Sequence, residues 1–116
     1  MNPSLKRKLI CNLMVFVEMN IGCCYIKFAL HGVRSLKDKR RVAKTIKDRV
    51  KNKFNISVAE VNCQDIHGIL HIGVAAVGSD TRYLEGLMNR TVNFIEEMYL
   101  ADMVDYQIKL LRLGSN

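Results

Sequence analysis

Residues 21–54 read IGCCYIKFALHGVRSLKDKRRVAKTIKDRVKNKF, and within this stretch a strand pattern passes directly into a helix pattern. Residues 21–30 are rich in β-branched, aromatic and small apolar side chains, which predicts a β-strand. Its inward face consists of Cys24, Ile26, Phe28 and Leu30. His31-Gly32 breaks this strand, and Ser35 followed three residues later by Asp38 is typical of a helix start.

The predicted helix begins at Ser35 and ends between residues 52 and 55. Apolar residues recur along it at helical spacing, which gives the helix one side suited to a protein core. This apolar side consists of Leu36, Val42, Ala43, Ile46, Val50 and Phe54.

The remaining pattern completes one small domain. Residues 56–63 predict a second strand, residues 64–68 a turn, and residues 69–77 a third strand. Residues 81–99 predict an amphipathic helix that Asp80 can cap, and residues 106–113 a last strand. The order β-α-β-β-α-β predicts an α+β ferredoxin-like sandwich over residues 19–113. Both helices should cover one face of a four-stranded antiparallel sheet and leave the other face bare.

Composition fits this interpretation and limits the function. The chain has 116 residues, 49% of them apolar, so it can bury an ordinary core. Its four cysteines, Cys11, Cys23, Cys24 and Cys63, form no C-x-x-C pair. We therefore expect reduced cysteines in a cytoplasmic protein.

The first eighteen residues are unusual. Lys6-Arg7-Lys8 followed by LICNLMVFV resembles the charged and apolar regions of a secretory signal, with Cys23 near the place of a lipoprotein cleavage site. The apolar run is too short to span a bilayer, so we expect no membrane contact. We predict that Met19 is the native start and that residues 1–18 are an extension, and export is the alternative.

Positive charge is concentrated in the first helix. Ten of the eighteen basic residues lie between Arg34 and Lys53, where Asp38 and Asp48 are the only acids. A helix wheel places six of these cations opposite or flanking the apolar side, and we name this set the basic ridge. It consists of Lys37, Arg40, Arg41, Lys44, Lys47 and Lys51. Because like charges four residues apart repel one another, a face that served only solubility would include more glutamates.

The basic ridge predicts contact with the phosphates of RNA or of a ribosomal particle. The alternatives are a solvated helix face without a partner, and a protein-interaction or dimerisation module whose ridge meets an acidic protein.

Several segments resemble the YlxP-like family, a bacterial domain of unknown function (503). They are Ser35-Leu36-Lys37 with Lys39-Arg40, Asn52-Lys53-Phe54-Asn55, residues 57–61, Gln64-Asp65, residues 73–75 with Asp80, and residues 93–97. The resemblance implies a ferredoxin-like fold, no established enzymatic activity and a suspected role in ribosome maturation. The chain departs from the family at Ile66-His67-Gly68, where a tryptophan and a longer turn are common.

The bare sheet face supports weaker hypotheses. Tyr25 beside Lys27 could stack one base, but the predicted third strand offers no aromatic platform. Because that strand is apolar on both faces, we expect a covering partner, and a homodimer is the simplest.

Catalytic, metal and cofactor sites are not expected. Cys63, His67 and His71 flank the predicted turn as conceivable zinc ligands, but the sequence offers no fourth ligand. Glu60 and Asp65 have no assignable acid or base partner, so we expect no enzyme.

Overall fold

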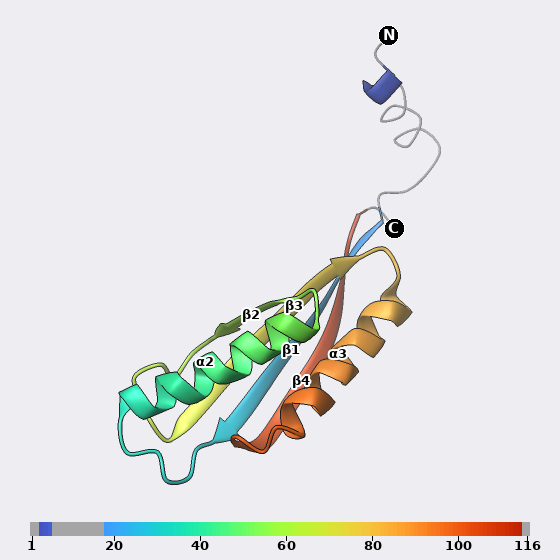
Figure 1. Cartoon of the computed structure of the whole chain (residues 1–116). Helices are drawn as coiled ribbons and strands as arrows, with labels where there is room; N and C mark the ends of the chain where they lie inside the picture. Colours follow the sequence, from blue (N-terminus) through green and yellow to red (C-terminus); the bar gives the residue numbers. More distant parts are fainter. Residues whose placement is uncertain (1–2, 6–17, 115–116) are drawn as a thin grey trace.

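Four antiparallel strands form one sheet in the order β2-β3-β1-β4 in the computed structural model (Figure 1). The structure describes residues 3–5 and 18–114. In chain order the elements are β1 (Met19–Ala29), α2 (Leu36–Lys53), β2 (Ser57–Glu60), β3 (Ile69–Gly78), α3 (Thr81–Glu96) and β4 (Asp102–Leu113). Both helices lie on the same face of the sheet. The predicted α+β ferredoxin-like fold is confirmed.

Strand β1 occupies the inner position between β3 and β4. It pairs with β3 from Asn20↔Gly78 to Ala29↔Ile69. It pairs with β4 from Met19↔Leu113 onward, with an irregularity in register between Lys27 and Phe28. The first and last strands of the domain are therefore direct neighbours.

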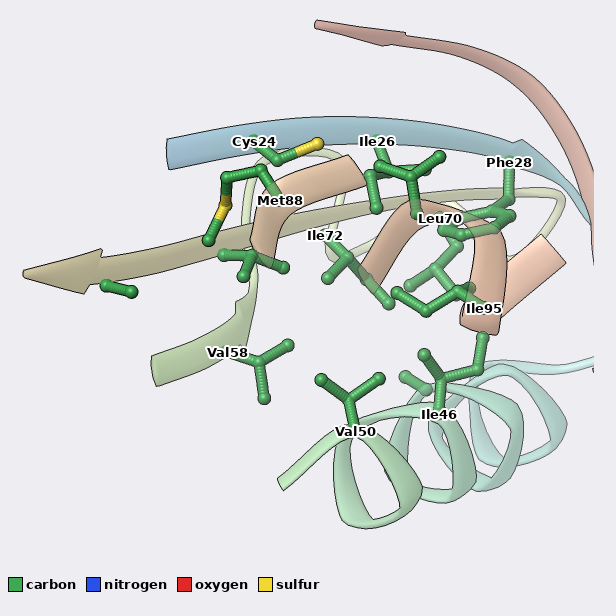
Figure 2. Packing of buried hydrophobic residues seen from close by; sticks show 14 of the residues in the cluster. Cys24, Ile26, Phe28, Ile46, Val50, Val58, Leu70, Ile72, Met88 and Ile95 are labelled. Carbon is green, nitrogen blue, oxygen red and sulfur yellow. The ribbon is translucent and has the colours of Figure 1, made fainter. Parts of the chain in front are cut away.

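The hydrophobic core lies between the sheet and the two helices (Figure 2). Even-numbered residues of β1 and β3 point into it, including Ile26 and Ile72, which are fully buried. From α2, Ile46 and Val50 approach the sheet opposite them. Full burial of each such side chain contributes about 1.5–3 kcal/mol relative to exposure, which fixes the helices on this face.

Helix α3 packs closely against β1 at Gly22. A Cβ atom at Gly22 would lie 3.1 Å from Leu84 Cβ and 3.4 Å from Met88 Cγ. Only glycine therefore allows this approach without a shift of the helix.

Both helices begin with the predicted caps. The Asp38 backbone N–H donates to Ser35 Oγ at 3.1 Å, and the Arg82 N–H donates to Asp80 Oδ1 at 2.9 Å. These side chains satisfy backbone donors that a helix start leaves without partners.

Three boundaries differ from the sequence expectation by three residues or more. Strand β2 ends at Glu60 instead of residue 63, because Asn62 and Cys63 adopt positive φ angles of 56° and 50°. Helix α3 ends at Glu96 instead of residue 99, and Tyr99 has a positive φ of 53°. Strand β4 begins at Asp102 instead of residue 106, because its first residues pair with the end of β1.

The expectations about residues 1–18 fall mostly outside the described residues and stay predictions. Within residues 3–5 and 18–114, no helix combines the length and apolarity needed to cross a bilayer.

Candidate nucleic-acid interface

The basic ridge forms one continuous strip along α2. At about 100° per residue, its six positions fall within an arc of about 120°. From Lys37 to Lys51 the strip extends about 21 Å along the helix axis. Five of the six side chains are exposed and Lys47 is half-buried. The structure thus brings together every residue that the sequence singled out for this surface.

Little negative charge compensates the ridge. Among the residues that the structure describes, Lys44 is the only ridge side chain within ion-pair distance of a carboxylate. Its Nζ atom donates to Asp48 Oδ2 at 2.6 Å, and both side chains are exposed. This hydrogen bond, together with the positive charges of Lys44, Lys51 and Lys47, lowers the pKa of Asp48 below its ordinary value. An exposed pair of this kind contributes little to stability and opens readily toward another anion.

Lys39 belongs to the same basic segment but faces inward. Its side chain is 1% exposed, and its Nζ donates to two backbone oxygens, Cys63 O at 2.6 Å and Ile66 O at 2.7 Å. The same Nζ lies 3.0 Å from Glu60 Oε1, an ion pair without hydrogen-bond alignment. Lys39 therefore ties the start of α2 to the end of β2 and to the loop that follows.

Sequence reasoning missed this role, although a signal was present. Lys39 precedes Ala43, Ile46 and Val50 by four, seven and eleven residues, so it lies on the buried side of the helix. A lysine there needs oxygen partners, which Glu60 and the loop carbonyls provide.

Two cross-strand rows, in which the residues of β2 and β3 are small, line a hollow in the face of the sheet away from the helices. The first row is Ser57, Ala75, Cys23 and Lys109, and the second is Ala59, Gly73, Tyr25 and Gln107. Together with Val61 they line an open hollow of about 530 Å³, which we name the sheet-face hollow. Glycine at position 73 contributes to this shape, because a Cβ there would lie 3.3 Å from Val61 Cγ1 and would require the Val61 side chain to shift.

Tyr25 is held rigidly at one side of the sheet-face hollow. Its hydroxyl lies 2.7 Å from His71 Nδ1, and Asn62 Nδ2 donates to the same oxygen at 3.4 Å. Partial burial, with the positive charges of Lys27 and Lys39, lowers the pKa of His71 below its ordinary value. A neutral His71 with its proton on Nε2 can accept a hydrogen bond from the Tyr25 hydroxyl at Nδ1, so both polar groups of the contact are satisfied.

The other candidate residues do not converge. Within the described part of the chain, no group of three or more His, Cys, Asp or Glu side chains is placed to hold a metal ion. Glu60 pairs with Lys39, and Asp65 lies exposed in the loop.

The two adjacent cysteines face opposite sides of β1, as the strand pattern predicts. Cys24 is buried in the core, and Cys23 faces the sheet-face hollow. Burial, followed by the neighbouring Cys23, raises the pKa of Cys24 to about 11, so its thiol stays protonated at neutral pH. Cys23, Cys24 and Cys63 are free thiols.

Comparison with known proteins identifies the family. Residues 21–108 match the family model described as "Protein of unknown function (DUF503)". The chain belongs to this family. It is 38% identical over 76 residues to the uncharacterized protein YlxP of Bacillus subtilis (strain 168), covering 66% of this chain and 83% of that protein. The resemblance to the YlxP-like family is confirmed.

Solved structures of similar shape include two designed proteins. The de novo designed protein Foldit4 is 17% identical with a TM-score of 0.48, covering 85% of this chain and 100% of that chain. A de novo designed protein with ferredoxin fold is 14% identical with a TM-score of 0.44, covering 80% of this chain and 83% of that one.

Proposed function

We propose that this protein binds RNA phosphates through the basic ridge, without catalysing a reaction, as a cytoplasmic factor that associates with ribosomal particles. The supporting observation is the arrangement of six cations on one face of α2, where Asp48 is the only acid in the strip. Phosphates are the partners that such a strip of side-chain donors fits, because each Lys or Arg can replace a condensed counterion.

Ribosomal RNA is the proposed target because of the family. The resemblance to YlxP-like proteins implies a suspected role in ribosome maturation, and the ridge supplies a surface for it. Contacts of this kind position an RNA without reading its sequence. Binding should therefore depend strongly on salt and weakly on the sequence of the RNA.

The test compares two charge-matched double variants. Arg40→Glu/Arg41→Glu removes two ridge cations, and Arg82→Glu/Arg90→Glu changes the same total charge on exposed residues of α3. Affinity for a fluorescein-labelled 16-nucleotide single-stranded RNA is measured by anisotropy at several salt concentrations. With six contacts, the wild-type log–log slope should be about −4 to −5.

We expect the ridge variant to bind at least tenfold more weakly at low salt, with a slope reduced in magnitude by about 1.5. The α3 variant should lose less than threefold. Equal losses in both variants would show that total charge, and not the ridge, determines binding. Cosedimentation of the wild type and the ridge variant with 30S and 50S subunits then tests the ribosomal part of the proposal.

A protein-interaction module is the second candidate, and the bare face supports it. At one end of this face, Val77 is 67% exposed and Leu113 57% exposed, beside Leu111 and Ile21. A second copy of the chain that covered these side chains would form a homodimer. Light scattering at micromolar concentration tests this prediction: a dimer mass that becomes monomeric in Val77→Lys would favour it.

A further inference from the structure

The sheet-face hollow has the composition of a ligand pocket. Its volume of about 530 Å³ lies in the range typical of small-molecule sites. Gly73, Ala75 and Ala59 have small side chains or none, so they form a low floor over β2 and β3. This low floor leaves room for a planar ring to stand against the Tyr25 side chain.

The Tyr25 side chain is held in place by contacts within the protein before any ligand binds. The hydroxyl of Tyr25 contacts His71 and Asn62, and the rings of Tyr25 and His71 meet edge to face with centroids 5.3 Å apart. Fixing the phenol before binding reduces the conformational entropy that the Tyr25 side chain itself would otherwise lose. A π-system that stacks on Tyr25 would gain about 1–3 kcal/mol, as aromatic side chains give to nucleic-acid bases.

Polar groups of β4 line the hollow on the other side of β1 from the floor. Gln107 follows Tyr25 in the same cross-strand row, and Lys109 closes the neighbouring row. The ammonium of Lys109 is exposed and suits a phosphate beside a base stacked on Tyr25.

From this arrangement we infer that the sheet-face hollow binds one nucleotide, with the base stacked on Tyr25 above the small residues of β3 and its phosphate at Lys109. The ligand is a free nucleotide or one unpaired nucleotide of an RNA. The inference does not rest on the proposed function, because the basic ridge lies on α2, on the other face of the sheet.

The experiment follows backbone amide shifts in the ¹⁵N-labelled full chain as AMP, adenosine or a hexameric oligoadenylate is added. We expect shift changes at Cys23, Tyr25, Gly73 and Ala75 with AMP. Lys109→Gln should weaken AMP at least threefold and leave adenosine unchanged. Gly73→Leu fills the floor and should weaken all three probes at least tenfold, whereas Gly68→Leu, where a Cβ meets nothing within 4 Å, should not.

The relative affinities of the hexamer and AMP distinguish the two sources of the nucleotide. If an RNA is the natural ligand, the hexamer should bind far more tightly than AMP. If a free nucleotide is the natural ligand, the hexamer should bind as tightly as AMP or less tightly. Shifts confined to α2 with the hexamer would overturn the inference and leave the proposed function intact. Absence of sheet shifts at millimolar AMP and with the hexamer would also overturn it. So would a dimer mass that Gly73→Leu converts to a monomer, since a second copy would then occupy the hollow.

Discussion

Replacing the buried Lys39 with methionine should destabilise the protein strongly. Methionine keeps most of the apolar stem but removes the ammonium that contacts Cys63 O, Ile66 O and Glu60. Three oxygens would then face one another without a donor between them.

The expected loss follows from the burial of this group. Removing one partner of a buried ion pair costs about 3–5 kcal/mol, because the other charge is left without compensation. Glu60 is 15% exposed, so water reaches part of its carboxylate and moves the expected loss toward about 3 kcal/mol. Since a small domain has about 5–15 kcal/mol of stability, this is a large fraction of the total.

Urea unfolding followed by circular dichroism measures the effect as a change in midpoint at constant slope. Lys37→Met is the matched control: the side chain is exposed on the same helix turn and should change stability by less than about 0.5 kcal/mol. A double variant of Lys39→Met with Glu60→Gln should recover about 1 kcal/mol or more of the loss, since the unpaired charge is gone. If Lys39→Met unfolds within about 1 kcal/mol of the wild type, the ammonium does not anchor the loop as described.

Three further changes have definite expected outcomes. Gly22→Ala places a Cβ 3.1 Å from Leu84 Cβ and should cost about 1–3 kcal/mol in urea unfolding, and an unchanged midpoint would show that α3 can move aside. Ser35→Ala removes the acceptor of the Asp38 N–H and should cost about 1 kcal/mol, whereas Ser35→Asp should retain stability. The pKa of His71 is lower in the folded state than in the unfolded chain, so the unfolded state takes up its proton first as the pH falls. The stabilisation by neutral His71 is complete above about pH 6.5 and is lost as the pH drops through the folded pKa. Urea unfolding of the wild type and of His71→Gln at pH 7.5 and 5.5 measures this stabilisation. If the two proteins differ in unfolding free energy by the same amount at both pH values, the prediction is contradicted.

Periodicity, together with turn and cap signals, predicted the order and type of the elements from β1 to β4, because most of these segments have one apolar face. The alternation around Ile26 and the helical spacing of Ile46 and Val50 report burial directly. The predicted boundaries of the elements were less accurate where pairing with another strand determines where an element begins or ends. Residues 102–105 carry no strand pattern of their own, and they extend because the end of β1 offers a partner.

The ridge was predictable and the sheet-face hollow was not, for a physical reason. Side chains on one helix face are fixed by spacing within one segment, so the ridge can be found on a helix wheel. The hollow depends on cross-strand register, which brings Ala59, Gly73 and Tyr25 into one row from three strands. Register is set by the packed sheet, and no single segment encodes it.

The pairing of Met19 with Leu113 also has consequences for how the domain assembles. The β1–β4 pair forms only when the first and last strands of the domain come together. This pairing raises the contact order of the native topology and is expected to slow folding. A circular permutant that joins these two residues through a short glycine-rich linker, and opens the chain in the 97–101 turn, would convert this distant pair into a local hairpin. Such a permutant should keep the same core and fold faster than the natural connectivity.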